Sequence, residues 1–381
     1  MNEFEKQYQE ILDFLKFEDY LLAVKRIIDF TLDTQEISFY TKTCNLLDWL
    51  DNNPNDNSKK EKLQELLAEL HSALVKRPQQ IRQNILEASE LTKKYSGFTL
   101  GPVNLSLNEG DIIGLVGENG NGKTTLLRSL CGELHPTSGH ISYNFKHEDL
   151  YELRTKLVYI PQRTDTWYGS MMDNLLFTAT SYGFSPQESP LVVELVVARL
   201  GLRKFRKHKW KDLSSGYKMR FELARMLLRK PKVLLIDEPL ANLDILAQQT
   251  VLEDFKAIAK SAFRPIGIIL SSQQLYEVEK TSDEVIFLKQ GIQKNLKENN
   301  EANDTEKHLV IEFESPWSQS KLNDCLLSTG LVSLQFNGGT YIATFNGNVT
   351  INHFMKAVID QNIPVVYIRD ISNSTRRFFV S

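Results

Sequence analysis

The sequence feature that most constrains the fold is a glycine-rich run, Gly117-Glu-Asn-Gly-Asn-Gly-Lys123-Thr124, which lies between an apolar segment and a helical one. The apolar segment 112–116 (IIGLV) is typical of a buried strand, and the segment after the run (TLLRSLCGEL) has the spacing of a helix. Together they form the context of a phosphate-binding P-loop, whose backbone N–H groups point at phosphate oxygens. A glycine-rich turn without a ligand is the alternative, and the flanking strand and helix disfavour it. The run therefore predicts nucleotide binding on an α/β fold.

A second motif supplies the acidic groups that nucleotide chemistry needs. The segment 233–239 (VLLIDEP) has the pattern of a buried strand that ends in Asp237 and Glu238. Taken alone, such a strand end is as often structural as functional, but this one follows a P-loop in the same chain. We expect Lys123 to reach the β- and γ-phosphates of ATP, and Thr124 and Asp237 to hold Mg²⁺. Glu238 is expected to polarise the attacking water.

Residues 85–295 resemble an ABC-type ATPase, because a third motif stands between the first two. The segment Leu213-Ser-Ser-Gly-Tyr217 is similar to the family's signature, usually written LSGGQ, and it also precedes a helical segment. The resemblance implies that Ser214, Ser215 and Gly216 lie near the γ-phosphate of the ATP held by the opposite subunit of a dimer. Small residues at a helix N-terminus suit an anion here as they do in the P-loop. Without the resemblance, Ser214 would be a helix N-cap and nothing more.

Three further positions match the family's order of motifs. Gln162, in Tyr-Ile-Pro-Gln, is similar to the glutamine that contacts Mg²⁺ and senses the membrane partner; alone, it is a polar turn residue. Tyr95 matches the aromatic side chain that stacks on adenine, although a lone tyrosine on a strand is often a packing residue. Asp244 matches the loop that crosses the dimer interface. The residues that the resemblance assigns to the nucleotide are Tyr95, Gly117, Glu118, Asn119, Gly120, Asn121, Gly122, Lys123, Thr124, Thr125, Ser214, Ser215, Gly216 and Asp244.

Departures from the family pattern bear on the rate of hydrolysis. Gln273 occupies the position of the family's switch histidine, so a neutral hydrogen-bond donor replaces a group that can be charged. Losing one transition-state donor outright lowers a rate by about 10²–10³-fold, and a retained neutral donor should cost less. Ser215 and Tyr217 replace the signature's first glycine and final glutamine, and both add bulk. We therefore expect intact ATP binding and slow or partner-dependent hydrolysis, with Gln162, Glu238 and Gln273 as the catalytic residues.

Hydrophobic spacing divides the chain into four parts. Residues 1–83 have the spacing of amphipathic helices; we expect this acidic region to dock a partner subunit, with simple packing against the ATPase as the alternative. Residues 84–295 alternate strands with helices, as in the P-loop NTPase core of an ABC ATPase with its helical subdomain. A polar linker, 296–307, leads to residues 308–381, where the order β-α-β-β-α-β predicts a small ferredoxin-like α+β domain. Its last strand is expected at 364–369.

Composition excludes several classes of protein. The chain has 381 residues, 41% of them hydrophobic and 24% charged, which is typical of a folded protein with more than one domain. The net charge of −3 argues against a protein that coats nucleic acid, so no nucleic-acid partner is expected. The stretch 203–211 interleaves bases with aromatic residues and has two interpretations. It is a nucleic-acid or anionic-lipid patch, or it is a solvated face of the helical subdomain, which we favour.

The sequence also predicts where the chain works. No stretch approaches the ~20 apolar residues that span a bilayer. The three cysteines are too far apart in sequence to build a disulfide framework, as is usual in a reducing cytosol. We expect a cytoplasmic chain that is peripheral on the inner face of the cell membrane, where a partner supplies the membrane part.

The resemblance implies the energising subunit of an ABC transporter. Two copies, or one copy with a related ATPase subunit, would close on two ATP molecules and pull on a separate transmembrane permease through the surface near Gln162 and residues 170–212. Residues 271–292 and the ending 372–379 resemble exporter ATPases, which favours export. A β-α-β-β-α-β tail is also known on some importer ATPases, and a packing platform without a ligand is a further possibility. The alternative function is a soluble ABC ATPase, either an ATP-dependent clamp or a regulator on ribosomes or nucleic acid.

Overall fold

The computed structural model describes residues 2–78, 82–241, 243–273, 275–294, 308–337 and 339–372, in two compact units. The first unit contains the chain up to residue 273 together with two short stretches between 281 and 293, and the second contains the chain from residue 294 together with two short segments before it. The expected linker 296–307 and the ending 373–379 lie outside the described residues. Within the described part, no helix is both long and apolar enough to cross a membrane.

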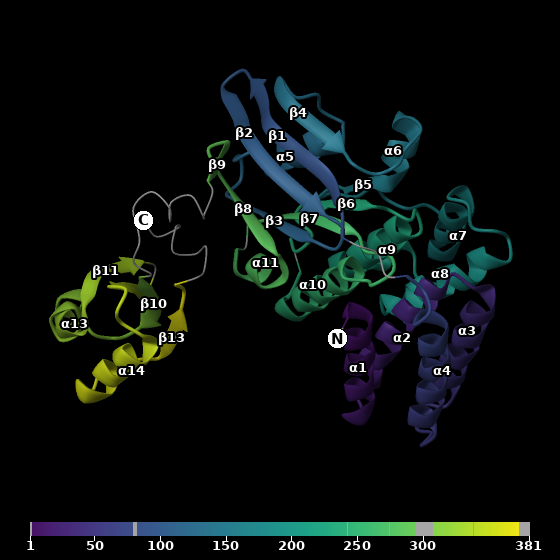
Figure 1. Ribbon diagram of the computed structural model, residues 1–381, viewed down its shortest axis with the longest axis horizontal. Coiled ribbons are helices and arrows are strands. Elements are labelled where there is room, and N and C mark those ends of the chain that lie inside the picture. The colour runs from purple at the N-terminus through teal and green to yellow at the C-terminus, as the bar shows by residue number, and fades with distance from the viewer. Residues whose placement is uncertain are drawn as a thin grey trace. The chain divides into compact units, whose positions relative to one another are not determined.

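The N-terminal residues form a bundle of four helices, as their spacing predicts (Figure 1). The helices are α1 (Glu3–Lys16), α2 (Tyr20–Thr34), α3 (Ile37–Asn52) and α4 (Lys59–Leu74). Their apolar side chains meet in one core, where Phe4, Ile11 and Leu15 of α1 pack with Leu67 and Leu70 of α4. Burial of one apolar face on each helix is what makes such amphipathic spacing stable in water.

A six-stranded sheet forms the centre of the first unit and accounts for the short apolar runs. Its strands are β3 (Ile112–Val116), β5 (Leu157–Ile160), β6 (Val233–Ile236), β7 (Gly267–Ser272), β8 (Glu284–Lys289) and β9 (Ile292–Lys294). The strand order is β5-β6-β7-β3-β8-β9, and β5, β6, β7 and β3 run parallel. Every residue of β3, β6 and β7 is buried, as expected for parallel strands with both faces covered. The carboxyl ends of these strands therefore meet at one edge of the sheet.

A second, antiparallel sheet brings a hairpin to the P-loop (Figure 1). Its strands are β1 (Asn84–Tyr95), β2 (Phe98–Asn108) and β4 (Ser138–Tyr143), in the order β2-β1-β4. The turn between β1 and β2 contains Gly97 at a φ of +88°, which favours glycine. A Cβ placed on Gly122 would lie 3.0 Å from the ring of Phe98, so the hairpin end lies against the glycine-rich loop.

The remaining helices of this unit build the ATPase core and a helical subdomain. They are α5 (Lys123–Leu130), α6 (Leu150–Lys156), α7 (Met171–Ser181), α8 (Glu188–Arg199), α9 (Ser215–Leu227) and α10 (Ile245–Ala259). Helices α7, α8 and α9 pack on one another and form the subdomain, whereas α10 packs on β7 of the central sheet. The predicted α/β core with a helical subdomain is thus present.

The basic stretch 203–211 is built into this subdomain through its aromatic residues. The ring of Phe205 lies 3.8 Å from the ring of Tyr217, and the ring of Trp210 stacks on Trp167 at 5.0 Å between centroids. Arginine side chains of the stretch pair with carboxylates of α3 and α8. Because Trp210 is buried and Phe205 is half-buried, these contacts agree with a face of the subdomain rather than with a platform for base stacking.

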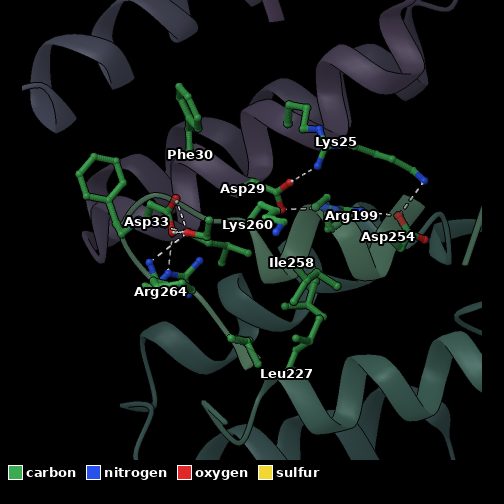
Figure 2. Close-up of a pocket in the computed structure, with 18 of the residues that line it drawn as sticks. Lys25, Asp29, Phe30, Asp33, Arg199, Leu227, Asp254, Ile258, Lys260 and Arg264 are labelled. Atoms are coloured by element: carbon green, nitrogen blue, oxygen red, sulfur yellow. Dashed lines mark hydrogen bonds and ion pairs between the residues drawn. The ribbon is translucent and has the colours of Figure 1, made fainter. Parts of the chain in front are cut away.

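Ion pairs tie the N-terminal bundle to the ATPase helices (Figure 2). Arg199, at the end of α8, donates to Asp29 of α2 and to Asp254 of α10, each over 2.6 Å. Nearby, Asp33 of α2 accepts from Arg264 over 2.7 Å, beside a cavity of about 800 Å³ between the bundle and α10. The bundle therefore packs against the ATPase, as one of the two interpretations expects, and docking of a partner stays a prediction.

The second unit contains the predicted ferredoxin-like domain. Its elements are β10 (Leu309–Glu314), α13 (Gln319–Leu326), β11 (Leu331–Asn337), β12 (Thr340–Phe345), α14 (Ile351–Asp360) and β13 (Tyr367–Asp370). The sheet is antiparallel with the order β11-β12-β10-β13, so the first and third strands are central. Phe313 and Phe345 pack on Leu322 of α13 and Phe354 of α14. The last strand begins later than expected, at Tyr367, and Pro364 at the expected start has no N–H to give to a ladder.

Candidate functional site

The loop after β3 has the backbone shape that a phosphate-binding loop requires. A Cβ on Gly117 would lie 2.4 Å from the carbonyl oxygen of Leu288, so no other residue fits there without a shift of the backbone. Gly120 and Gly122 have φ values of +82° and +96°, a region that residues with side chains seldom adopt. Gly122 is the N-cap of α5, so the loop leads directly into a helix. The other loop residues assigned to the nucleotide are exposed or half-buried: Glu118, Asn119, Asn121 and Thr125.

Lys123 and Glu238 meet at the base of this loop. The Nζ atom of Lys123 donates to the carbonyl oxygens of Gly117 at 2.7 Å and Glu118 at 3.3 Å. It also lies 3.2 Å from Oε1 of Glu238, in an ion pair that solvent hardly reaches. Glu238 has a φ of +49°, which costs a non-glycine residue about 1–3 kcal/mol and marks a candidate functional position.

Thr124 and Asp237 bring two oxygen atoms together at the same edge. Thr124 Oγ1 donates to Asp237 Oδ2 over 2.8 Å. Asp237 directly follows β6 and is 3% exposed, and its backbone N–H continues the ladder to Ile160 of β5 at 2.9 Å. The hydroxyl at the start of α5 and the carboxylate at the end of β6 are thus placed as a pair. Hydroxyl and carboxylate oxygens are the ligands that a hard cation such as Mg²⁺ prefers.

Gln162 and Gln273 flank the acidic pair, because they follow the two strands that neighbour β6. Gln162 lies just beyond β5 and Gln273 directly follows β7, and both side chains are exposed. In an open parallel sheet, residues beyond the carboxyl ends of the strands line the ligand-binding edge. The structure thus places both glutamines at that edge, and their contacts with a nucleotide stay predictions.

Two side chains that hold Asp237 have no role in the sequence prediction. Ser271 Oγ donates to Asp237 Oδ1 over 2.6 Å and accepts from the backbone N–H of Glu238 over 2.8 Å. The hydroxyl of Tyr159 donates to Asp237 Oδ2 over 3.3 Å. Burial and the nearby Asp237 carboxylate raise the pKa of Tyr159, so its phenol keeps the proton that it donates. The sequence signal that could have identified Ser271 is its hydroxyl group at the end of an apolar strand. Its contact with Asp237, however, depends on which strand lies beside β7.

Tyr95 lies at the end of β1, next to the P-loop. It pairs with Phe98 across the hairpin, and the Phe98 ring approaches Gly122. Tyr95 is 45% exposed, and Lys93 Nζ lies 5.5 Å from the centroid of its ring. An exposed aromatic ring beside a phosphate-binding loop suits stacking on a base, which stays a prediction.

Ser214, Ser215, Gly216 and Asp244 form a second group, at the starts of α9 and α10. Ser214 caps α9 and accepts a backbone N–H at 3.5 Å, and Asp244 caps α10 and accepts the N–H of Ala247 at 2.9 Å. The two helix starts are neighbours, because a Cβ on Gly216 would lie 3.8 Å from the Cβ of Ala247. The structure thus places the signature next to the loop that contains Asp244.

Known proteins resemble this chain over the region that holds these groups. A family model for ABC transporters matches residues 100–241. The spermidine/putrescine import ATP-binding protein PotA of Mycoplasma mycoides is 31% identical over 271 residues, which cover 68% of this chain and 72% of PotA. The chain belongs to the family of ABC transporter ATP-binding subunits. Members of this family bind and hydrolyse ATP, so the chain is an ATPase of the ABC class.

Further relatives and solved structures agree with the family. The lactococcin transport/processing ATP-binding protein LcnC-like of Lactococcus lactis is 33% identical over 219 residues, which cover 54% of this chain and 29% of that protein. Among solved structures, cbiO1 of Clostridium perfringens, part of the ABC transporter complex cbiONQ, matches with a TM-score of 0.51 and 27% identity. That match covers 56% of this chain and 87% of cbiO1. The expected ABC ATPase core is confirmed.

Proposed function

We propose that this ATPase subunit dimerises around two ATP molecules and drives a separate transmembrane permease. One observation supports the ATP site most directly: Lys123 pairs with Glu238, and Thr124 with Asp237, at one edge of the sheet and at the foot of the glycine-rich loop. A lysine for the phosphates, oxygen ligands for a metal ion and a carboxylate for water are the groups that phosphoryl transfer to water requires.

Mg²⁺ is the metal ion that we propose for this site. Thr124 Oγ1 and Asp237 Oδ2 are 2.8 Å apart, close enough for one cation to contact both oxygens. Gln162 would add an amide oxygen from the neighbouring strand end. The ion would supply charge neutralisation at the β- and γ-phosphate oxygens.

Side chains of this chain would bind the phosphates and orient the attacking water. Lys123 would exchange its contact with Glu238 for the phosphates when ATP binds, which frees the carboxylate to orient the attacking water. Gln273 would donate a neutral hydrogen bond to the γ-phosphate from the end of β7. Because this donor has no charge, we expect hydrolysis to be slow unless a partner subunit compensates.

The group of residues at the starts of α9 and α10 supports a dimer. Asp244 is followed by two large apolar side chains that are strongly exposed, Ile245 and Leu246. Exposed apolar side chains of this size, next to a signature that serves a second nucleotide, suit contact with another ATPase subunit. That subunit is either a second copy of this chain or a related ATPase.

The segment after Gln162 supports contact with a permease. Tyr168, near Gln162, is 85% exposed, and Phe177, within residues 170–212, is 75% exposed. Both lie on the surface through which the family resemblance implies contact with the permease. Such a partner would place the chain on the cytoplasmic face of the membrane. We propose export as the direction of transport, because residues 271–292 resemble exporter ATPases. The relatives carry both import and transport/processing names, so the comparisons favour neither direction.

The alternative is an ABC ATPase that does not transport, either a clamp or a regulator on ribosomes or nucleic acid. The named relatives are transporter ATP-binding proteins, which favours transport. The aromatic rings of 203–211 pack within the subdomain, so that stretch gives the nucleic-acid version no support.

The test is purification of the tagged chain from its native membranes, beside Tyr168→Glu and Phe177→Glu. We expect a polytopic membrane protein to co-purify with the parent and to be lost from both variants, while the isolated variants keep the ATP turnover of the parent. Co-purified ribosomes, or no membrane protein at all, would contradict a transporter subunit. Direction follows from reconstituted inverted vesicles, in which ATP-driven accumulation of substrate indicates export.

A further inference from the structure

We infer that Ser271 is a positioning residue of the ATPase site, which joins Asp237 and Glu238 through a single hydroxyl group. The inference rests on the roles proposed above for these two carboxylates. Ser271 is completely buried, and its hydroxyl group both donates and accepts a hydrogen bond. It donates to Asp237 Oδ1 over 2.6 Å and accepts from the Glu238 backbone N–H over 2.8 Å.

The position of Ser271 follows from the strand order. Strand β7 lies between β6, which ends at the acidic pair, and β3, which leads into the P-loop. Leu270 is level with Ile236 of β6, so Ser271 is level with the next residue, Asp237, beyond the end of that strand. On the other side, Ser271 is level with Leu115 of β3. The hydroxyl therefore stands at the centre of the edge where the P-loop and the acidic motif meet.

The first consequence concerns the orientation of the Asp237 carboxylate. Ser271 holds Oδ1, and therefore Oδ2 is the oxygen that meets Thr124 at 2.8 Å and Tyr159 at 3.3 Å. A carboxylate held at both oxygens cannot rotate freely about its terminal bond, so one oxygen is reserved for the side of the P-loop. Outer partners of this kind orient metal-binding carboxylates, and their loss typically lowers metal affinity or activity by about 10–100-fold.

The second consequence concerns the backbone of Glu238. Its φ of +49° is strained for a residue with a side chain, and the hydrogen bond to Ser271 satisfies the N–H of this strained residue. The N–H, the hydroxyl and the Asp237 carboxylate form a short chain of hydrogen bonds, in which each bond polarises the next. One side chain thus fixes both the proposed metal ligand and the backbone that supports the proposed water-orienting carboxylate.

The test compares Ser271→Ala with Ser271→Thr, which keeps a hydroxyl, and with Ser271→Cys as a second variant that keeps a weaker donor. The matched control is Ser189→Ala, since Ser189 is a buried serine of α8 whose hydroxyl donates to backbone oxygens away from the site. Steady-state turnover gives kcat and KM for ATP. Calorimetry gives the affinity for ATP with and without Mg²⁺, and thermal melting shows whether each variant folds.

We expect Ser271→Ala to lower kcat by about 10–100-fold and to remove most of the gain in ATP affinity that Mg²⁺ provides, while the metal-free ATP affinity stays within about threefold of the parent. At least one of Ser271→Thr and Ser271→Cys should recover most of both losses, and Ser189→Ala should show neither. In an Asp237→Asn background, Ser271→Ala should change the Mg²⁺ effect little further, because the hydroxyl acts through that carboxylate.

Two results would overturn the inference. One is a Ser271→Ala variant with the kcat and Mg²⁺ effect of the parent while Asp237→Asn and Glu238→Gln lose turnover. The other is a Ser271→Ala variant whose ATP affinity falls as much without Mg²⁺ as with it, and whose melting temperature falls as well. That result would mean a purely structural role. A different outcome, in which Asp237→Asn and Glu238→Gln also behave as the parent, would refute the proposed site itself and with it the role of Ser271.

Discussion

At the scale of single residues, Gln273 makes the sharpest prediction about rate. It follows β7 and is exposed at the edge of the sheet, where the family carries a histidine. We expect Gln273→His to raise kcat about tenfold, because an imidazolium donates to a developing negative charge more strongly than an amide. The gain should grow as the pH falls through about 6.5, where the ring becomes charged. Steady-state turnover between pH 6 and 8 measures this.

The control for this prediction is Gln273→Ala, which removes the donor and should turn over more slowly than the parent at every pH. An equal kcat in the parent, Gln273→His and Gln273→Ala would mean that this position does not face the γ-phosphate.

The positions of the candidate site residues were predictable where their determinants are adjacent in sequence. Lys123, Thr124, Asp237 and Glu238 were identified because a strand, a glycine-rich loop and a helix, or a strand and its acidic end, are contiguous in the chain. Ser271 was missed because its contacts with Asp237 and Glu238 depend on the strand beside which β7 lies, and parallel neighbours are far apart in sequence. The sequence alone does not contain that pairing in any local pattern.

At the scale of secondary-structure elements, the contact of α2 with α8 and α10 makes a prediction about stability. Arg199 is 2% exposed, and its guanidinium pairs with Asp29 and Asp254. Burial disfavours the charged form of Arg199, but the two carboxylates outweigh this and raise its pKa, so the side chain stays charged. We expect Arg199→Met to lower the free energy of unfolding by up to about 3–5 kcal/mol, because buried Asp254 loses its shorter ion pair and keeps the one with Lys25, while half-buried Asp29 loses one of its pairs.

Urea unfolding followed by tryptophan fluorescence measures this loss. The matched control is Arg128→Met, since Arg128 pairs with Glu133 on the surface at 2.9 Å and both side chains are nearly half exposed. We expect that variant to lose about 0–1 kcal/mol. Similar losses in the two variants would show that the junction between the bundle and the ATPase does not depend on the buried pair.

The elements themselves were largely predictable, because burial on one face leaves a period in the sequence. The helical spacing of residues 1–83 and the order β-α-β-β-α-β after residue 308 both correspond to the observed elements. The contacts that join elements were not predictable. Arg199 meets carboxylates on α2 and α10, and a single charged residue at the end of an apolar helix gives no signal of such partners.

At the scale of the whole molecule, the proposed dimer predicts that the side chain at position 216 affects association with the partner subunit and not folding. A Cβ on Gly216 would meet Leu243 at 3.5 Å and Ala247 at 3.8 Å, which are ordinary contacts, so alanine fits within this chain. We therefore expect Gly216→Ala to keep the melting temperature and the ATP affinity of the parent. It should lose turnover by at least about tenfold, because in the proposed dimer the added methyl group would stand where the nucleotide of the partner subunit must approach closely.

Sedimentation of Gly216→Ala in a Glu238→Gln background, with and without ATP, separates association from chemistry. We expect ATP to dimerise Glu238→Gln alone and to leave the double variant monomeric. Gly117→Ala is the contrasting variant, because its Cβ would clash with the backbone of Leu288 at 2.4 Å and should disturb folding itself. An ATP-dependent dimer of the double variant would place the signature away from the interface.

The most direct measurement is the Mg²⁺-dependent ATP turnover of the purified chain beside Glu238→Gln. We expect the parent to hydrolyse ATP slowly and only with Mg²⁺, and Glu238→Gln to lose at least about 100-fold in kcat while it binds ATP as tightly as the parent. If the parent binds ATP tightly without turnover, the same comparison is made with the partner ATPase subunit present. Equal turnover in parent and variant, or turnover without Mg²⁺, would contradict hydrolysis at the edge formed by Lys123, Thr124, Asp237 and Glu238.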